Sequence, residues 1–527
     1  MGSFCRAMNS RPLPSSANAP TAAAVLRFRG NDAAELFTRE LQDSLAGIMT
    51  KNRIGPEGGI SAGAFTASVD GRPWHDTIWS RDNAVLLREL IHHGDLATAT
   101  ALARALIRSV APNAEGFWTL PMYLARGERS SGSEWDGNAL FIVGVVLLWE
   151  RLPHEDPARR ELADFLLAPE STVRAVLAEL SHRPFVAGSG EFGGGLGLEG
   201  LFYNVVQNAM IAWMLDVIAA RFRPADPRAP ELAAGCAAAA QALRQGLITH
   251  FVAGDGTWIW ALDRATLRPS DLALKSPENQ GFGGVNGVMS HAADVHGFQP
   301  LRDPAPWLAP SLQTFWSLLG RPHRLRQFAR HGMWTQFDVL HEGFLTGPSY
   351  GQGYALQDML LMDRPELYTP AAHWLARATF APEYPITRSN PHWFYERYYS
   401  PDDPARKTRD EGCGALNLVC VAEPMKVARL MAGLDDHAMG EVALLPRLPV
   451  GWTGLDAAGL LVRTAQGHTL VDFEVMADPT GRILRVHGTS REPLPLLKVR
   501  LGTAARPDWR TVAAGATTFD LSAPASH

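Results

Sequence analysis

One carboxylate of this 527-residue chain, Glu396, is surrounded in sequence by aromatic residues. Trp393 and Tyr395 precede it, and Tyr398 and Tyr399 follow it. Because an apolar, aromatic setting tunes the basicity of a carboxylate, Glu396 is a candidate general base. Inverting hydrolysis of a glycosidic bond is one reaction that needs such a base, together with a second carboxyl group roughly 6.5–9.5 Å away that acts as the acid.

A second group of candidates lies where an irregular segment becomes a helical one. Trp79, Arg81 and Asp82 stand at this junction. A guanidinium and a carboxylate can form paired, charge-assisted hydrogen bonds with adjacent hydroxyl groups. A purely structural interpretation is equally open, in which Asp82 caps the helix and Arg81 is its ion-pair partner.

Three further polar loops carry residues suited to sugar hydroxyls. Trp135 and Asp136 begin an apolar helical segment, where Asp136 could also be a cap and Glu134 a surface charge. A glycine-rich loop holds Glu191 and Glu199. The last of these loops holds Tyr350 and Gln352.

The elements that must position these residues are mostly helices. Between about residues 31 and 435, apolar residues recur at steps of three and four. The predicted helical segments are 84–108, 138–151, 157–181, 202–222, 229–250, 309–330, 353–379 and 413–432. Long loops alternate with helix pairs, and loops of that length in a compact domain are usually functional. We therefore expect helical hairpins arranged in a ring with their long loops on one face. An α-solenoid is the alternative, but no sequence repeats at a fixed period.

The pattern changes after about residue 440, where apolar and polar residues alternate between turn residues. This alternation predicts a small antiparallel β-sandwich at the C-terminal end. The expected domains are a disordered tail over 1–30, a catalytic helical domain over 31–437 and the β-sandwich over 438–527.

Taken in order, the polar blocks resemble those of the glucoamylase-type inverting α-glycosidases, within the six-hairpin glycosidase superfamily. The resembling blocks are 79–82, 135–140, 202–207, 347–350 and 395–412. The first is similar to the family's W-x-R-D segment, which holds hydroxyls of the non-reducing glucose. The block at 202–207 resembles the helix that follows the catalytic acid, and the last one resembles the block that carries the general base.

This resemblance implies a mainly α fold, an (α/α)6 barrel or six-hairpin toroid, and an exo-acting hydrolase of α-glucosides or related α-linked oligosaccharides. It implies that Glu396 is the general base. The family's W-E-E acid segment is missing here, so Glu191, Glu199 and Asp136 are the candidate acids, in that order. Glu199 is closer to the start of a helix, whose dipole would lower its pKa and weaken a general acid. Asp136 is included because related families use an S-G-x-D acid that residues 131–136 resemble.

The resemblance also implies the residues that bind the substrate, from several of the loops above. They are Trp79, Arg81, Asp82, Trp135, Asp136, Tyr350, Gln352 and Trp393.

Composition excludes several other classes of protein. The net charge of −5 and a pI near 6.4 give no basic excess for a nucleic-acid partner. No apolar run is long enough to cross a membrane, so no membrane is expected. The four cysteines have no zinc-ligand spacing. Cys413 and Cys420 are expected to be buried free thiols, and free thiols favour a reducing, cytoplasmic location. We expect no metal, because the cysteines and histidines show no metal-ligand spacing. We expect no cofactor, because the G-x-G-x-x-G pattern at 195–200 lacks a preceding strand. The oligomeric state stays open.

Two other functions remain possible on the sequence alone. A polysaccharide lyase or sugar epimerase could use a helical toroid, with Tyr399 or His392 as the base. A non-catalytic sugar-binding protein is the third possibility, because a fold does not fix a function.

Overall fold

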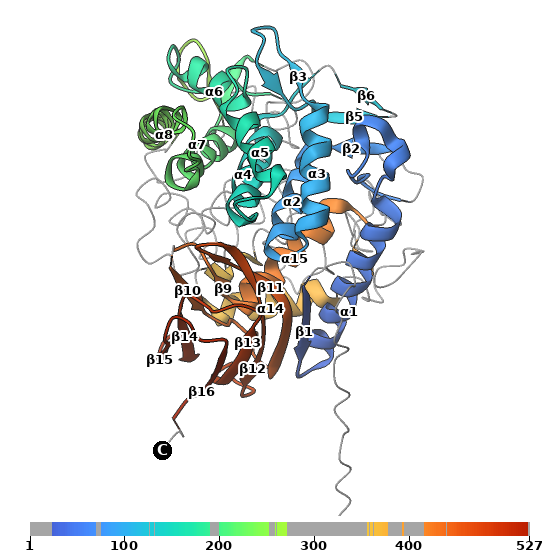
Figure 1. The fold of residues 1–527 in the computed structure, drawn as a ribbon, viewed down its shortest axis with the longest axis vertical. Coiled ribbons are helices and arrows are strands. Elements are labelled where there is room, and N and C mark those ends of the chain that lie inside the picture. Colours follow the sequence, from blue (N-terminus) through green and yellow to red (C-terminus); the bar gives the residue numbers. More distant parts are fainter. Residues whose placement is uncertain are drawn as a thin grey trace, which may run out of the picture.

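The computed structural model describes the helical region in several stretches and nearly all of the C-terminal region. The described residues are 24–69, 75–125, 127–130, 132–189, 200–251, 259, 261–270, 356–357, 359–361, 363–377, 393–394, 416–438 and 440–524. Figure 1 shows two parts, a helical part and a β-sheet against one end of it.

Four of the described helices are buried on nearly all sides and form an inner layer. They are α2 (Ser80–His92), α4 (Trp135–Arg151), α7 (Val205–Arg221) and α15 (Leu418–Ala432). Every residue of α2 and of α15 is buried, as is all of α4 after its first residue. Helices α4 and α7 are apolar on nearly all sides, which requires cover on all sides, whereas α2 and α15 also bury paired charges such as Glu89 and Arg429, 2.9 Å apart. In the layer, α15 packs on α2, α2 on α4, and α4 on α7.

The other described helices cover this layer from outside. They are α1 (Asp32–Gly47), α3 (Leu96–Ser109), α5 (Pro157–Leu167), α6 (Thr172–Leu180), α8 (Ala229–Phe251) and α14 (Pro365–Arg377). Two short helical segments follow α1, a π-helix η1 (Ile48–Asn52) and a 3-10 helix η2 (Pro56–Ser61). In α1 buried and exposed residues alternate with the helical period, as expected for one covered face. The described helices of this part of the chain thus form an inner and an outer layer.

Short strands lie at the N-terminal ends of the inner helices, the end far from the large sheet (Figure 1). They are β2 (Thr77–Trp79), β3 (Ala111–Pro112), β4 (Trp118–Thr119), β5 (Tyr123–Ala125), β6 (Glu128–Arg129), β7 (Phe202–Asn204) and β8 (Ala261–Asp263). Strands β2, β5 and β6 form one sheet, and β3–β4 and β7–β8 are pairs. The prediction of a helix from residue 202 is wrong by three residues, because 202–204 pair with β8 before α7 begins.

Two other predicted segments each contain two helices. The segment 84–108 contains α2 and α3, and the chain turns between them at His93-Gly94-Asp95, where the sequence indicates a tight turn. The segment 157–181 is also two helices, α5 and α6, because the chain turns after Leu167. The predicted helix 309–330 lies outside the described residues.

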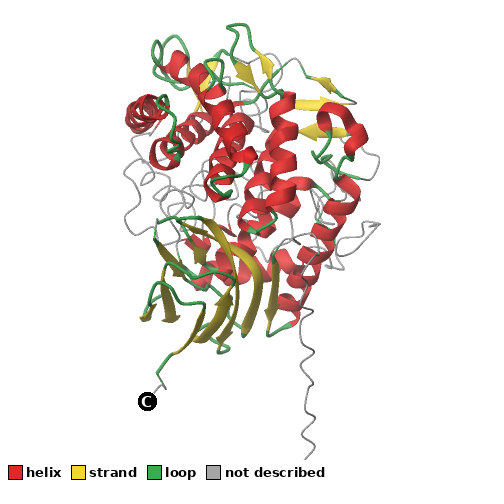
Figure 2. Ribbon diagram, viewed as in Figure 1, coloured by secondary structure: helices red, strands yellow, loops and turns green. Residues whose placement is uncertain are grey.

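The C-terminal region forms one nine-stranded, curled sheet (Figure 2). Its strands are β1 (Val25–Arg29), β9 (Leu434–Asp435), β10 (Glu441–Leu444), β11 (Gly454–Thr464), β12 (Gly467–Ala477), β13 (Ile483–Ser490), β14 (Leu496–Gly502), β15 (Pro507–Val512) and β16 (Thr518–Ser522). The order is β1-β11-β12-β13-β14-β10-β9, with β15 on β14 and β16 on β13. Alternate residues of β12 are buried, which agrees with the predicted period of two.

Three details of the predicted β-sandwich differ in the structure. The strands are hydrogen-bonded into a single sheet rather than two. The pair β10–β14 is parallel, so the sheet is not wholly antiparallel. Strand β1 comes from within the expected tail over residues 1–30 and pairs with β11. A boundary at residue 30 would therefore separate this strand from its sheet.

Buried ion pairs join the C-terminal ends of the inner helices to the sheet region. Arg151, at the end of α4, donates two hydrogen bonds of 2.8 Å to Asp436. Glu150 accepts from Arg463 of β11 at 2.6 Å and from Arg221 of α7 at 3.1 Å. Burial alone would raise the pKa of Asp436, but the charges of Arg151 and Arg463 outweigh it and lower the pKa. The two parts of the molecule are thus tied by paired charges.

In the part of the chain that the structure describes, no helix is long and apolar enough to cross a membrane. Cys236 and Cys420 are buried, and burial was predicted for Cys420. Cys413 lies outside the described residues.

Candidate functional site

Four charged side chains meet where α2 and α4 begin. The Nη1 atom of Arg81 lies 3.2 Å from Oε2 of Glu134 and 3.5 Å from Oδ2 of Asp136. Its Nε atom lies 3.7 Å from Oδ1 of Asp82. All four residues are buried, with exposed fractions between 0% and 8%. We call Arg81, Asp82, Glu134 and Asp136 the charged quartet.

The local structure explains why two helices deliver these side chains to one place. The start of α2 is fixed by Ser80, whose N–H donates to the Met122 carbonyl (3.1 Å) and whose hydroxyl donates to the Pro121 carbonyl (2.6 Å). In α4, Gly137 lies directly against the backbone of Arg81, where a Cβ would be only 3.3 Å from the Arg81 nitrogen. The first turns of the two helices can pack this closely because residue 137 has no side chain.

Aromatic rings border the charged quartet. The rings of Trp79 and Tyr123 lie 5.2 Å apart, on the paired strands β2 and β5. The Arg81 guanidinium lies 5.6 Å from the centre of the Trp79 ring, within the range of a cation–π interaction. The site thus combines flat apolar faces with charged hydrogen-bonding groups.

Within the described residues, the quartet combines hydrogen-bond acceptors with a donor group. Among the described residues, three carboxylates share one guanidinium, at 3.2–3.7 Å. Carboxylate oxygens accept hydrogen bonds, and a guanidinium donates them. Groups of hydroxyls supply donors to carboxylates and acceptors to a guanidinium, so a polyhydroxylated ligand matches this arrangement chemically.

The capping interpretation of Asp82 and Asp136 is wrong. The residue that caps α2 is Trp79, and the residue that caps α4 is Glu134, neither through its side chain. Asp82 and Asp136 lie inside the first turns, where a carboxylate also benefits from the positive end of the helix dipole.

Glu134 belongs to the quartet, although its sequence context also allowed a surface charge. Its side chain is 2% exposed and contacts Arg81, so that interpretation is wrong. The one sequence feature that could have indicated a site residue was the position of Glu134 directly before Trp135 and Asp136. A single acid in the sequence Ser-Gly-Ser-Glu otherwise resembles an ordinary surface loop.

Trp135 is held by the loop that leads toward the candidate acids. Its N–H donates to the Ser189 hydroxyl at 3.2 Å, and the Ser189 N–H donates to Oε1 of Gln207 on α7 at 3.1 Å. Gly200 donates its N–H to the Gly188 carbonyl at 2.8 Å. Residues 188, 189 and 200 therefore lie together, beside the start of α4. Glu191 and Glu199 lie outside the described residues.

Trp393 contacts η1, and Phe394 contacts α1. The Lys51 ammonium is 5.7 Å from the Trp393 ring centre. The N–H of Phe394 donates to the Ser44 hydroxyl at 3.1 Å, and its carbonyl accepts from the N–H of Asn417 at 3.3 Å. Glu396 follows two residues after Phe394 and, like Tyr350 and Gln352, lies outside the described residues.

A chain of backbone hydrogen bonds links this region to the strand that carries Trp79. The N–H of Leu418, the residue after Asn417, donates to the Ala67 carbonyl at 3.1 Å. The N–H of Ala67 in turn donates to the Thr77 carbonyl of β2 at 2.8 Å. The start of α15, Phe394 and the start of α2 thus belong to one hydrogen-bonded region.

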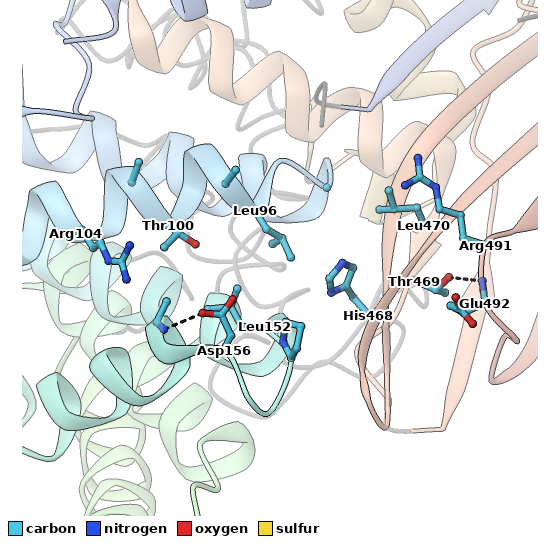
Figure 3. A pocket seen from close by; sticks show the side chains of 15 residues that line it. Leu96, Thr100, Arg104, Leu152, Asp156, His468, Thr469, Leu470, Arg491 and Glu492 are labelled. Atoms are coloured by element: carbon cyan, nitrogen blue, oxygen red, sulfur yellow. Dashed lines mark hydrogen bonds between the residues drawn. The ribbon is translucent and has the colours of Figure 1, made fainter. Parts of the chain in front are cut away.

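A separate cavity of about 660 Å³ lies at the opposite end of α2 and α4 (Figure 3). It is lined by residues that follow these helices, such as Leu96 and Leu152, and by His468 of β12, which projects into it from the sheet. The Nδ1 atom of His468 lies 2.8 Å from the Arg151 carbonyl, and burial lowers the pKa of this histidine. Since α2 has 13 residues, this cavity is about 20 Å from the quartet.

No group of three or more histidine, cysteine, aspartate and glutamate side chains that could hold a metal ion occurs within the described ranges. The quartet has an arginine at its centre, which opposes binding of a cation there.

No protein-family model matches the chain, and no curated protein matches it. Solved structures of two rhamnosidases do resemble it. An alpha-L-rhamnosidase of Streptomyces avermitilis, complexed with L-rhamnose, is 14% identical with a TM-score of 0.53, over 94% of this chain and 42% of that one. The GH78 family rhamnosidase of Bacillus sp. GL1 is 14% identical with a TM-score of 0.51, over 87% of this chain and 41% of that one. The chain thus spans about two fifths of each rhamnosidase and shares their fold.

Proposed function

We propose that the protein is an inverting, exo-acting glycoside hydrolase of α-glucosides or related α-linked oligosaccharides, built on a six-hairpin barrel. The observation that carries the proposal is the charged quartet, in which one buried guanidinium is surrounded by three carboxylates beside the rings of Trp79 and Tyr123. The fold shared with two rhamnosidases supports sugar hydrolysis as the reaction class.

The quartet is suited to holding the sugar at the cleavage point. Arg81 donates to hydroxyl oxygens, and the carboxylates of Asp82, Glu134 and Asp136 accept from hydroxyl hydrogens. Because the sugar ring distorts as the bond breaks, hydrogen bonds to it can strengthen in the transition state and so increase turnover as well as affinity. Trp79 and Tyr123 offer apolar ring faces beside these groups.

We assign the general base to Glu396. It takes a proton from water, the water oxygen forms a bond to the anomeric carbon, and the glycosidic carbon–oxygen bond breaks. Phe394 is fixed at the hydrogen-bonded region described above, and two residues of extended chain reach at most about 7 Å. That reach, together with the aromatic residues around Glu396 in sequence, supports the assignment.

The general acid protonates the leaving oxygen, and we keep the order Glu191, Glu199, Asp136. Glu191 is two residues from Ser189, and Glu199 is next to Gly200; both neighbours lie beside the start of α4. Asp136 is third because it contacts Arg81, and an ion pair uses a charged carboxylate whereas a general acid must carry a proton.

The test is NMR spectroscopy on a panel of α- and β-linked glucosides, mannosides and rhamnosides, which reports cleavage and the first-formed anomer. We expect cleavage of α-glucosides with the β-anomer formed first. Inverting cleavage of rhamnosides or mannosides alone would keep the mechanism and overturn the sugar assignment. An unsaturated product absorbing in the ultraviolet would identify a lyase, and binding without any reaction would identify a sugar-binding protein.

A further inference from the structure

Three adjacent inner helices begin with the same buried side chain in the same position. The fourth residue is Asn83 in α2, Asn138 in α4 and Asn208 in α7. Each is followed by alanine in the sequence, and each is at most 1% exposed. The intervals along the chain differ, so this repeat has no fixed period in the sequence.

Asn83 pairs with the backbone of one loop residue. Its Oδ1 atom accepts from the N–H of Phe65 at 2.9 Å, and its Nδ2 atom donates to the carbonyl of the same residue at 2.9 Å. The same Nδ2 atom donates to the Trp79 carbonyl at 3.0 Å. One carboxamide thus binds both polar backbone groups of a loop residue and the residue that precedes its own helix.

Asn208 repeats this arrangement atom for atom. It accepts from the N–H of Val186 at 2.8 Å and donates to the carbonyls of Val186 at 3.0 Å and Asn204 at 2.9 Å. Asn138 makes the corresponding contacts to the N–H of Leu120 at 2.8 Å and to the Glu134 carbonyl at 2.6 Å. In all three helices the carboxamide links the loop to the residue four positions earlier.

The three loop residues lie close in sequence to the residues of the candidate site. Leu120 precedes Pro121 and Met122, which fix Ser80 at the start of α2. Val186 leads to Ser189, which accepts from the N–H of Trp135. Phe65 leads to Ala67, which links β2 to the start of α15.

We propose that Asn83, Asn138 and Asn208 are positioning residues of the sugar site, each fixing one loop of the site against the N-terminal end of one helix. The proposal rests on the proposed function, because it gives these residues an effect on turnover. Active-site geometry must be held closely, and groups that orient the reacting residues affect the rate without touching the substrate. The carboxamides do this by satisfying loop backbone groups that would otherwise be buried without partners.

The test compares Asn138→Ala with the removal of a buried cap far from the site, at the start of the outer helix α3. Asp95 is 4% exposed and caps α3 by accepting from the N–H of Thr98 at 3.0 Å. Asp95→Ala therefore removes a buried hydrogen bond without touching the proposed site. Both variants are assayed well below their melting temperatures for kcat, KM and hydrogen exchange.

For Asn138→Ala we expect kcat to fall by at least about tenfold, with KM changed less. Exchange in the peptide that contains Leu120 should rise by about tenfold or more, while the peptides with Phe65 and Val186 keep their rates. Asp95→Ala should lower the melting temperature and keep kcat within about twofold of the wild type. Wild-type kcat in Asn138→Ala, or an equal loss of kcat in Asp95→Ala, would overturn the proposal.

Two further comparisons keep the test decisive. If an alanine variant does not fold, the isosteric Asn208→Asp replaces it. The carboxylate cannot donate to the Val186 and Asn204 carbonyls, so kcat should still fall. A wild-type kcat in this variant would overturn the proposal. Exchange is measured without substrate. A wild-type protein that hydrolyses nothing would therefore contradict the proposed function, whereas unchanged exchange at Leu120 in Asn138→Ala would contradict the positioning role.

Discussion

Among the described residues, the inner helices carry buried charges at both ends, and the two sets differ in the distances between opposite charges. At the C-terminal ends, three guanidinium groups and two carboxylates meet at 2.6–3.4 Å, including the two 2.8 Å bonds from Arg151 to Asp436. At the N-terminal ends, three carboxylates share one guanidinium at 3.2–3.7 Å. Both sets agree with the helix dipole, which favours anions at N-terminal ends and cations at C-terminal ends.

The difference teaches that burial and charge alone do not identify a functional site. The C-terminal set is closely paired and joins helices to the sheet, which is a structural task. The N-terminal set has longer distances between its charged groups and two aromatic rings beside it, which suits a ligand with many hydroxyls. Substitutions at the N-terminal ends should therefore lower turnover and keep stability, whereas substitutions at the C-terminal ends should lower stability and keep turnover.

The largest expected effect comes from Glu396→Gln. The amide keeps the shape of the side chain but cannot take a proton from water, so hydrolysis should fall by about 10²–10⁴-fold or more while the protein still folds. The measurement is kcat on the best substrate of the NMR panel, with circular dichroism as the control for folding. A variant that keeps more than about a tenth of the wild-type rate would exclude Glu396 as the base.

The candidate acids should be distinguished by the leaving group. Glu191→Gln, Glu199→Gln and Asp136→Asn are each assayed on a natural sugar and on a fluoride or nitrophenyl glycoside. Loss of the true acid should impair the natural substrate strongly and spare the activated one, which needs little protonation. If all three variants remain active on the natural sugar, the acid lies elsewhere.

At the other end of α4, Arg151→Ala should affect stability rather than turnover. It removes the partner of the buried Asp436 carboxylate, and breaking a buried pair in this way costs about 3–5 kcal/mol. Urea unfolding measures the loss, and kcat well below the unfolding midpoint should stay close to the wild-type value. A large loss of kcat in this folded variant would contradict the division between the two ends.

A smaller, pH-dependent effect is expected from His92. Burial lowers its pKa well below 6.5, and the nearby charges of Arg429 and Arg151 lower it further. The unfolded chain therefore binds a proton that the folded chain rejects, so stability should fall as pH drops below about 6.5. Melting temperatures between about pH 7.5 and 5.5 measure this, and His92→Gln should flatten the profile. An equal slope in the variant would assign the pH dependence to other groups.

Much of the fold could be predicted from the sequence, because local patterns dictate it. The helices of the inner and outer layers follow from apolar periodicity, and β12 follows from its alternation. Strand β1 could not be found this way, because its partner β11 lies more than 400 residues away in the sequence. The parallel pairing of β10 with β14 could not be predicted either, because no local sequence signal determines which strands pair.

The site could be predicted in part. Trp79, Arg81 and Asp82 were identifiable by their place at a loop-to-helix junction, and the structure brings Arg81 and Asp82 together with Asp136. Glu134 was missed because its burial depends on the packing of Gly137 against Arg81. The repeated asparagines were missed for a similar reason. Their common role is visible only when each is seen to contact a different loop.

The most direct test of the account compares one buried aspartate from each end of the inner layer. Asp82→Asn and Asp436→Asn remove one charge each, and both carboxylates are at most 8% exposed. We expect Asp82→Asn to melt like the wild type and lose about a hundredfold in kcat. Asp436→Asn should melt at a lower temperature and keep its kcat. A stable Asp82→Asn variant with wild-type turnover would contradict the central claim that the N-terminal ends of α2 and α4 form the sugar site.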